Sequence, residues 1–246
     1  MLPFAACPAL YIFLVVEHSQ DMNSRCGHEE STLLHLASRV GHVVVAHFLV
    51  ERGADVMAQN HSGDTPLHEA SKSGGVEAVQ SLMEHGSLAT AQAKNGSTPL
   101  HEASLSGNVE ITRFLVGHGA DLTAQDGNGS TPLHIAPYSP QGGMDVVRFL
   151  VEHGAEPAAL DKDQSTPLHN VIKISQGSIE VVRFLVEPGP DPTAQDKDGN
   201  TPLHLASREG MTEAVRFLIE HGADATARDK HGQLRYTERR KPDMEM

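Results

Sequence analysis

The chain has 246 residues, of which 39% are hydrophobic and 4% aromatic, and it contains no Trp. Its formal net charge of −13 repels the phosphates of a nucleic acid, so we do not expect that class of partner. Two cysteines make neither a disulfide framework nor a cysteine metal site, and they fit a reducing intracellular compartment.

The first sixteen residues are almost wholly apolar. This stretch is too short to span a membrane, and it lacks the basic start and the cleavage site of a secretory signal. Residues 14–19 match residues 149–154 of the same chain. We therefore expect residues 1–31 to form a degenerate partial repeat, of which the second helix is kept and the first is missing.

From Thr32 onward the chain repeats itself. The frame Thr-Pro-Leu-His begins at Thr65, Thr98, Thr131, Thr166 and Thr201, and the variant Thr-Leu-Leu-His begins at Thr32. Successive threonines are 33, 33, 33, 35 and 35 residues apart. A fixed period of this size is typical of stacked supersecondary units and not of a domain with one central core.

Repeat six gives the clearest view of one unit. A turn rich in Asp, Asn and Gly precedes Thr201, which is a good helix cap, and Pro202 suits the first helical position. The pattern predicts a short helix that ends at Glu209-Gly210 and a second helix over residues 212–219. Gly222 then has the place of a left-handed residue after a helix. Each repeat is thus turn, helix, turn, helix.

These motifs resemble the ankyrin repeat family, whose pattern is roughly D-x-x-G-x-T-P-L-H-x-A, a glycine turn, a V-V-x-x-L-L helix and G-A-D. The resemblance covers about four-fifths of the chain and places an ankyrin repeat domain of six repeats over residues 32–228. It implies an all-α solenoid of stacked helix-turn-helix units, with hairpin-like fingers that project beside a concave face. The usual work of the family is protein–protein binding.

Repeats four and five depart from the pattern. Each carries two extra residues between its helices, which explains the two 35-residue steps. We expect Pro137 to end its helix early and Val171, in place of a small residue, to loosen packing. Three prolines over residues 188–192 should shorten the preceding helix. We expect these two repeats to open more readily than repeats two and three.

Residues 229–246 begin a seventh finger and then stop matching. The basic residues of this tail could form a short nuclear-import signal, but a frayed and solvated terminus is the favoured reading. They are Arg235, Arg239, Arg240 and Lys241.

No pattern for catalysis, a cofactor or a metal is present. His68-Glu69 and His101-Glu102 lack the second His that a zinc protease motif needs, since Lys72 and Leu105 occupy those positions. No nucleophile elbow, phosphate-binding loop or dinucleotide fingerprint occurs. We expect each frame histidine to make hydrogen bonds within or between repeats.

The resemblance places partner contacts at finger tips and near the end of each first helix, where the repeats differ. Leu105, Tyr138 and Ile174 are candidate apolar anchors. The lysines at 72, 94 and 162 would favour a partner with some acidic groups. The predicted protein-binding residues are His61, Asp64, Glu69, Lys72, Lys94, Asn95, Glu102, Leu105, Asn128, Tyr138, Lys162, Asp163, Lys173, Ile174, Lys197, Asp198 and Arg208.

The resulting hypothesis is a non-enzymatic scaffold or adaptor, cytoplasmic or nuclear, that binds a protein partner on the concave face. Two alternatives stay open at this point. The chain could regulate transcription or signalling through its partner, or it could be the repeat part of a larger multidomain enzyme. A third reading is a drifting copy with no selected partner. No membrane association and no small-molecule substrate are expected.

Overall fold

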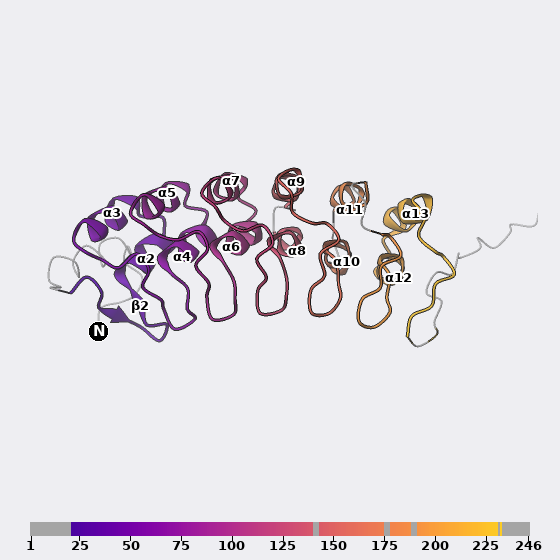
Figure 1. Cartoon of the computed structure of the whole chain (residues 1–246), viewed down its shortest axis with the longest axis horizontal. Helices are drawn as coiled ribbons and strands as arrows, with labels where there is room; N and C mark the ends of the chain where they lie inside the picture. Colours follow the sequence, from indigo (N-terminus) through magenta and orange to yellow (C-terminus); the bar gives the residue numbers. More distant parts are fainter. Residues whose placement is uncertain (1–20, 140–142, 175–177, 188–190, 231, 233–246) are drawn as a thin grey trace, which may run out of the picture. The chain divides into compact units, whose positions relative to one another are not determined.

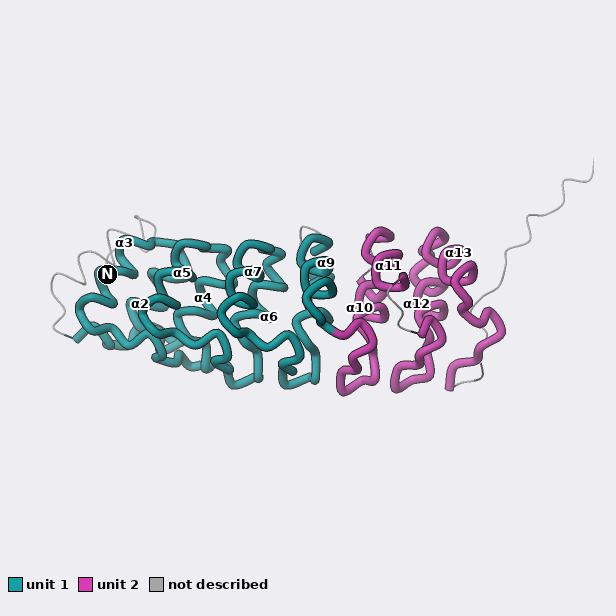
Figure 2. Tube along the Cα trace, turned by 45° about the horizontal axis from the view of Figure 1, so that its top comes forward, with its two compact units in different colours: residues 1–155 teal, residues 156–246 magenta. Residues whose placement is uncertain are grey.

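The computed structural model describes residues 21–139, 143–174, 178–187, 191–230 and 232. The helix expected over residues 14–19, the basic tail and most of the two insertions lie outside these residues. The chain divides into two compact units, residues 1–155 and residues 156–246 (Figure 2). Each unit is described by itself.

Unit 1 holds four repeats. A two-stranded antiparallel ribbon, β1 (Arg25–Cys26) and β2 (Ser31–Thr32), forms the first finger. The first helices, which form one row in Figure 1, are α2 (Leu33–Arg39), α4 (Pro66–Ser73), α6 (Pro99–Ser106) and α8 (Pro132–Ile135). The second helices, which form another row, are α3 (Val43–Glu51), α5 (Val76–Glu84), α7 (Val109–Gly117) and α9 (Met144–Glu152).

Unit 2 repeats the same arrangement. Its first helices are α10 (Pro167–Lys173) and α12 (Pro202–Arg208), and its second helices are α11 (Ile179–Val186) and α13 (Thr212–Glu220). In both units a first helix packs on the next first helix and on the second helix of its own repeat. The only strands among the described residues are β1 and β2, which confirms the all-α repeat fold expected from the sequence.

Every first helix begins in the same way. The frame threonine is the cap, proline follows it in five of the six repeats, and the frame histidine reaches back to the cap. At Thr98 the backbone N–H donates to Nδ1 of His101 at 3.2 Å, and the threonine hydroxyl lies 2.8 Å from the same nitrogen. Histidine thus performs the role that Glu or Gln has in an ordinary capping box.

The other nitrogen of the ring reaches the next repeat. Nε2 donates to the carbonyl of the residue that precedes the next frame threonine, so His35 bonds Asp64 at 2.8 Å and His101 bonds Ser130 at 2.9 Å. His68 bonds Ser97 and His169 bonds Asn200, each at 3.1 Å. Because Nδ1 accepts a backbone N–H and a carbonyl can only accept, the neutral Nε2–H form is the one that satisfies both contacts. The structural role expected for these histidines is confirmed.

The core is a thin layer of small and aliphatic side chains between neighbouring helix pairs. The leucine of each frame is buried, as is the residue three positions after it in all six repeats. Those leucines are Leu34, Leu67, Leu100, Leu133, Leu168 and Leu203. Val171 occupies a buried site that holds Ala in the other five repeats, and its effect on packing stays a prediction.

Two expected helix ends are confirmed. In repeat four, α8 has four residues and gives way to a 3₁₀ turn, η1 (Ala136–Tyr138), which contains Pro137. In repeat five, α11 has eight residues, whereas α9 and α13 have nine. Pro188 and Pro190 lie outside the described residues, but the helix ends ahead of them at Val186.

Neighbouring fingers within a unit are tied by one backbone hydrogen bond, such as Lys94 N–H to the Ser62 carbonyl at 3.0 Å. This close approach favours glycine two residues before the frame threonine: a Cβ on Gly63 would lie 2.6 Å from the Lys94 nitrogen. Gly63 also has φ +80°. Repeats one and five carry Glu30 and Gln164 at this position, with φ +50° and +58°, a left-handed conformation that costs a non-glycine residue free energy. Neither position was predicted from the sequence.

We predict that His101→Ala lowers the free energy of unfolding by about 1–3 kcal/mol, because it removes a cap contact and leaves buried polar groups unpaired. His204→Ala is the matched control: it has the same cap contact, but its Nε2 has no partner among the described residues. Urea denaturation should show the smaller loss for His204→Ala. Equal losses would mean that the bond between repeats contributes nothing.

Stability should also depend on pH. Burial lowers the pKa of His35, His68, His101 and His169 below the ordinary 6.5, although the carbonyl acceptors oppose this. The unfolded chain therefore binds protons more readily than the folded one. The stabilisation is complete above about pH 6.5 and is lost as the pH falls, by up to about 1.4 kcal/mol per pH unit for each histidine. Denaturation at several pH values between about 5.5 and 7.5 measures this slope, which should be shallower in His101→Gln.

Gln164→Gly should raise the free energy of unfolding by about 1 kcal/mol, because relief of the left-handed strain exceeds the added entropy of the unfolded chain. The reciprocal change, Gly199→Gln, should lower it by a similar or larger amount. Gly199 has φ +78°, and its Cβ would lie 2.9 Å from the Lys230 nitrogen. A loss of stability in Gln164→Gly would show that the glutamine side chain is a net stabilising element.

Candidate functional site

One position recurs seven residues after each frame threonine, at or near the end of the first helix, and it is exposed in every repeat except repeat five, where it is partly buried. We call these residues the helix-end positions. In unit 1 they are Arg39, Lys72, Leu105 and Tyr138, and in unit 2 they are Lys173 and Arg208. Leu105 is 41% exposed and Tyr138 is 44% exposed, and the two belong to consecutive repeats.

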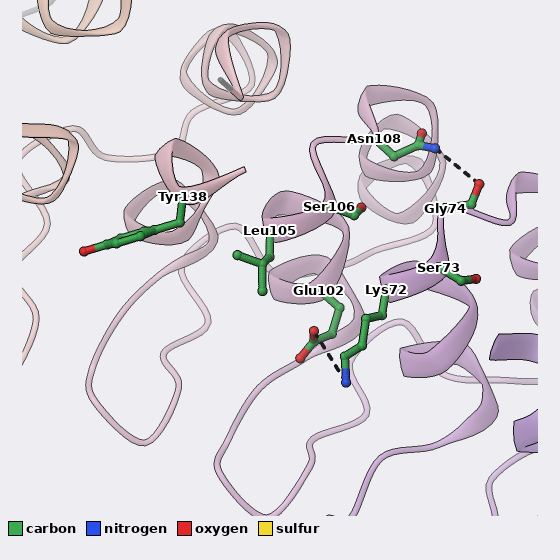
Figure 3. Close-up of a pocket in the computed structure, with 8 residues that line it drawn as sticks. All are labelled: Lys72, Ser73, Gly74, Glu102, Leu105, Ser106, Asn108 and Tyr138. Atoms are coloured by element: carbon green, nitrogen blue, oxygen red, sulfur yellow. Dashed lines mark hydrogen bonds and ion pairs between the residues drawn. The ribbon is translucent and has the colours of Figure 1, made fainter. Parts of the chain in front are cut away.

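A pocket of about 510 Å³ opens at these positions in unit 1. Three helix-end residues, Lys72, Leu105 and Tyr138, contribute to its lining together with Glu102 (Figure 3). The remaining lining residues are Ser73, Gly74, Ser106 and Asn108. The pocket therefore spans consecutive repeats and combines apolar side chains with charges of both signs.

The charges in this pocket come from buried carboxylates around one lysine. Lys72 Nζ lies 3.5 Å from Asp64 Oδ2 and 3.9 Å from Glu102 Oε2. The Ser97 hydroxyl donates to Glu102 Oε1 at 2.8 Å and holds that carboxylate in place. Burial raises the pKa of nearby Glu69, while Lys72 and Arg39 oppose the shift. Lys72 is thus the centre of an ion-pair network that links two repeats.

Asn108 also lines the pocket and was not among the predicted residues. Its Oδ1 accepts from Ile111 N–H at the start of α7, and its Nδ2 donates to the Gly74 carbonyl of the previous repeat at 3.4 Å. The available signal was its place as the residue before a second helix, where Asn is a strong cap.

Lysines of unit 2 are paired in a similar way. Lys173 Nζ donates to the Ser165 hydroxyl at 2.8 Å and lies 3.9 Å from Asp196 Oδ2. Lys197 and Asp163 form a 2.9 Å ion pair between neighbouring fingers, and the hydrogen bond from Lys197 lowers the pKa of Asp163. Both residues are exposed, so this pair contributes little to stability.

The structure separates the predicted contact residues into three groups by exposure. Most are exposed: His61, Lys72, Lys94, Asn95, Leu105, Asn128, Tyr138, Lys162, Asp163, Lys197, Asp198 and Arg208. Lys173 and Ile174 are partly buried. Asp64, Glu69 and Glu102 are buried, at 9%, 5% and 9% exposure. Glu69 and Glu102 are thus less exposed than expected of partner contacts, but Glu102 still contributes to the lining of the pocket.

The described residues contain no group of three or more His, Cys, Asp or Glu side chains placed to hold a metal ion. Within the same part of the chain, no helix is long and apolar enough to cross a membrane. The pocket at the helix-end positions of unit 1 is therefore the main candidate site.

Comparison with known proteins agrees with this architecture. The model of the family described as "Ankyrin repeats (3 copies)" matches residues 5–93, 88–161 and 141–229. Among solved structures, the human ASB11 ankyrin repeat domain is similar with a TM-score of 0.75 and 25% sequence identity, over 83% of this chain and 90% of that one. No curated protein matches the sequence. Since the family model covers nearly the whole repeat region, the chain belongs to the ankyrin repeat family.

Proposed function

We propose that this chain is a non-enzymatic protein-binding module, a scaffold or adaptor, that recognises its partner through the fingers and first helices of unit 1. The observation that carries the proposal is the contrast between its two surfaces. The helix-end positions of unit 1 are exposed and differ from repeat to repeat, while the frame around them is nearly constant. They can therefore encode a partner without disturbing the fold.

The exposed residues of the second helices differ much less from repeat to repeat than the helix-end positions do. Four of them carry the same pair, an acidic residue at the second position and Arg at the fifth. In α7 and α11 that arginine covers the phenylalanine of the next repeat, with Arg113 lying 4.9 Å from the Phe149 ring centre and Arg183 lying 5.4 Å from that of Phe217. These residues stabilise the stack, so we assign them a structural role.

The apolar side chains supply candidate anchors. Affinity at protein interfaces is concentrated in a few well-packed apolar or aromatic residues. Leu105 and Tyr138 are exposed on consecutive repeats and line the same pocket. The negative charge of the chain, −13, supports a protein partner over a nucleic acid.

This proposal includes the division of the chain and its location. Residues 32–228 would form the six-repeat binding domain, residues 1–31 a degenerate partial repeat, and residues 229–246 a partial seventh finger with a basic tail. The location would be cytoplasmic or nuclear. The scarcity of cysteine, with Cys26 free, supports a reducing compartment.

The test begins with a partner captured by the full chain and identified. Leu105→Asp and Tyr138→Asp should each weaken its binding by at least about tenfold, because a charge placed at an anchor must be desolvated. Arg148→Glu, on the exposed side of α9, is the control and should leave the affinity nearly unchanged. Helix content measured by circular dichroism should be the same in all variants. Loss of binding in Arg148→Glu alone would move the interface to the second helices.

A further inference from the structure

The pocket at the helix-end positions is lined by one lysine and one glutamate, and two further carboxylates adjoin that lysine, so its surroundings carry an excess of negative charge. Lys72 faces two carboxylates, Asp64 and Glu102, and a third, Glu69, lies close enough to affect it. Burial alone would lower the pKa of Lys72, but Glu102, Asp64 and Glu69 together raise it. The ammonium group is therefore held by the chain itself.

This network decides which charge a partner can bring. A carboxylate that approached Lys72 would compete with two carboxylates already within 4 Å of the ammonium and would be repelled by both. A cation that approached Glu102 would meet the opposite situation, since one lysine does not neutralise the surrounding acids. Like-charge contacts disfavour the wrong partners of an interface.

An apolar surface adjoins this acidic region. Figure 3 shows the Leu105 side chain between Tyr138 on one side and the Glu102–Lys72 pair on the other. An aliphatic side chain could pack on Leu105, and the ring of Tyr138 offers a face suited to a cation. The volume of about 510 Å³ is enough for a few side chains but not for a whole folded element.

We infer that this pocket binds a protein segment that presents a lysine or arginine next to an apolar side chain, with the cation directed to Glu102 and the apolar group to Leu105. The inference rests on the proposed function and reverses the expectation, drawn from the lysines in the sequence, of an acidic partner. A basic and apolar segment is complementary in charge and polarity to an acidic pocket with an apolar wall.

The direct test uses two matched dipeptides, acetyl-Leu-Arg-amide and acetyl-Leu-Glu-amide, titrated into the full chain with labelled leucine methyl groups. The arginine peptide should shift the Leu105 methyl signals in a saturable way, and the glutamate peptide should bind at least about fivefold more weakly. Leu105→Ala identifies the signals and should reduce the affinity for the arginine peptide. Equal or tighter binding of the glutamate peptide, or no binding of either, would overturn the inference.

Two charge variants should change the affinity for the arginine peptide in opposite directions. Glu102→Gln keeps an acceptor for the Ser97 hydroxyl and removes one negative charge, so it should weaken binding of the arginine peptide severalfold. Lys72→Gln removes the neutralising ammonium and should strengthen it. Thermal unfolding of each variant verifies that the repeats remain folded. The reverse pair of effects would indicate an acidic ligand.

The same variants separate this inference from the proposed function. If Leu105→Asp abolishes binding of a captured partner, while Glu102→Gln strengthens it and Lys72→Gln weakens it, the binding surface is right and the basic partner is wrong. If Leu105→Asp, Glu102→Gln and Lys72→Gln all leave that partner bound with unchanged affinity, both proposals fail. Binding of spermidine as tightly as the arginine peptide, and independently of Leu105, would also overturn the inference, because it would mean a general cation site.

Discussion

The two-sided hydrogen bonding of the frame histidines is the interaction on which the rest of the structure depends. Nδ1 closes the start of its own helix, and Nε2 holds the finger of the next repeat. The neutral Nε2–H ring makes both bonds, since one nitrogen must accept and the other must donate. Capping and stacking are therefore coupled in one side chain. A proton added to Nδ1 removes the acceptor of the threonine N–H and places a charge on a buried ring, although Nε2–H still donates to the next repeat. The stack is for that reason sensitive to acid as well as to substitution.

The frame residues set the backbone, so the exposed residues beside them can vary. Because the threonine, leucine and histidine of each frame fix the start of the first helix, the helix-end positions can hold Arg39, Lys72, Leu105 or Tyr138 after the same capped first turn, even where the helix gives way to a 3₁₀ turn at Tyr138. Surface chemistry and fold are then nearly independent, as expected of a repeat protein whose stability is a sum of local and neighbour terms. Lys72 is a partial exception, since it also compensates carboxylates at the base of two fingers.

Departures from the frame gather in repeat five of unit 2. Gln164 adopts a left-handed conformation, Val171 fills a site that holds Ala elsewhere, and α11 is one residue shorter than α13. Natural sequences are usually consistent from one level of structure to the next. Several local conflicts in one repeat are the physical reason for the prediction that it opens more readily than repeats two and three.

Much of the fold could be predicted from the sequence. The period indicates stacked units, and the resemblance to ankyrin repeats implies how they are arranged. The caps, the helix ends and the early stop at Pro137 follow from residues that are close in sequence. The sequence also indicated the exposure of Leu105 and Tyr138. Only the tertiary structure decided the charge of the site. Asp64, Glu69 and Glu102 look like surface residues in the sequence, yet they are buried, and Lys72 pairs with carboxylates from its own repeat and from the next one. The reason is physical: a helix is specified by its neighbours in sequence, whereas the net charge of a pocket depends on side chains that meet only when successive repeats stack.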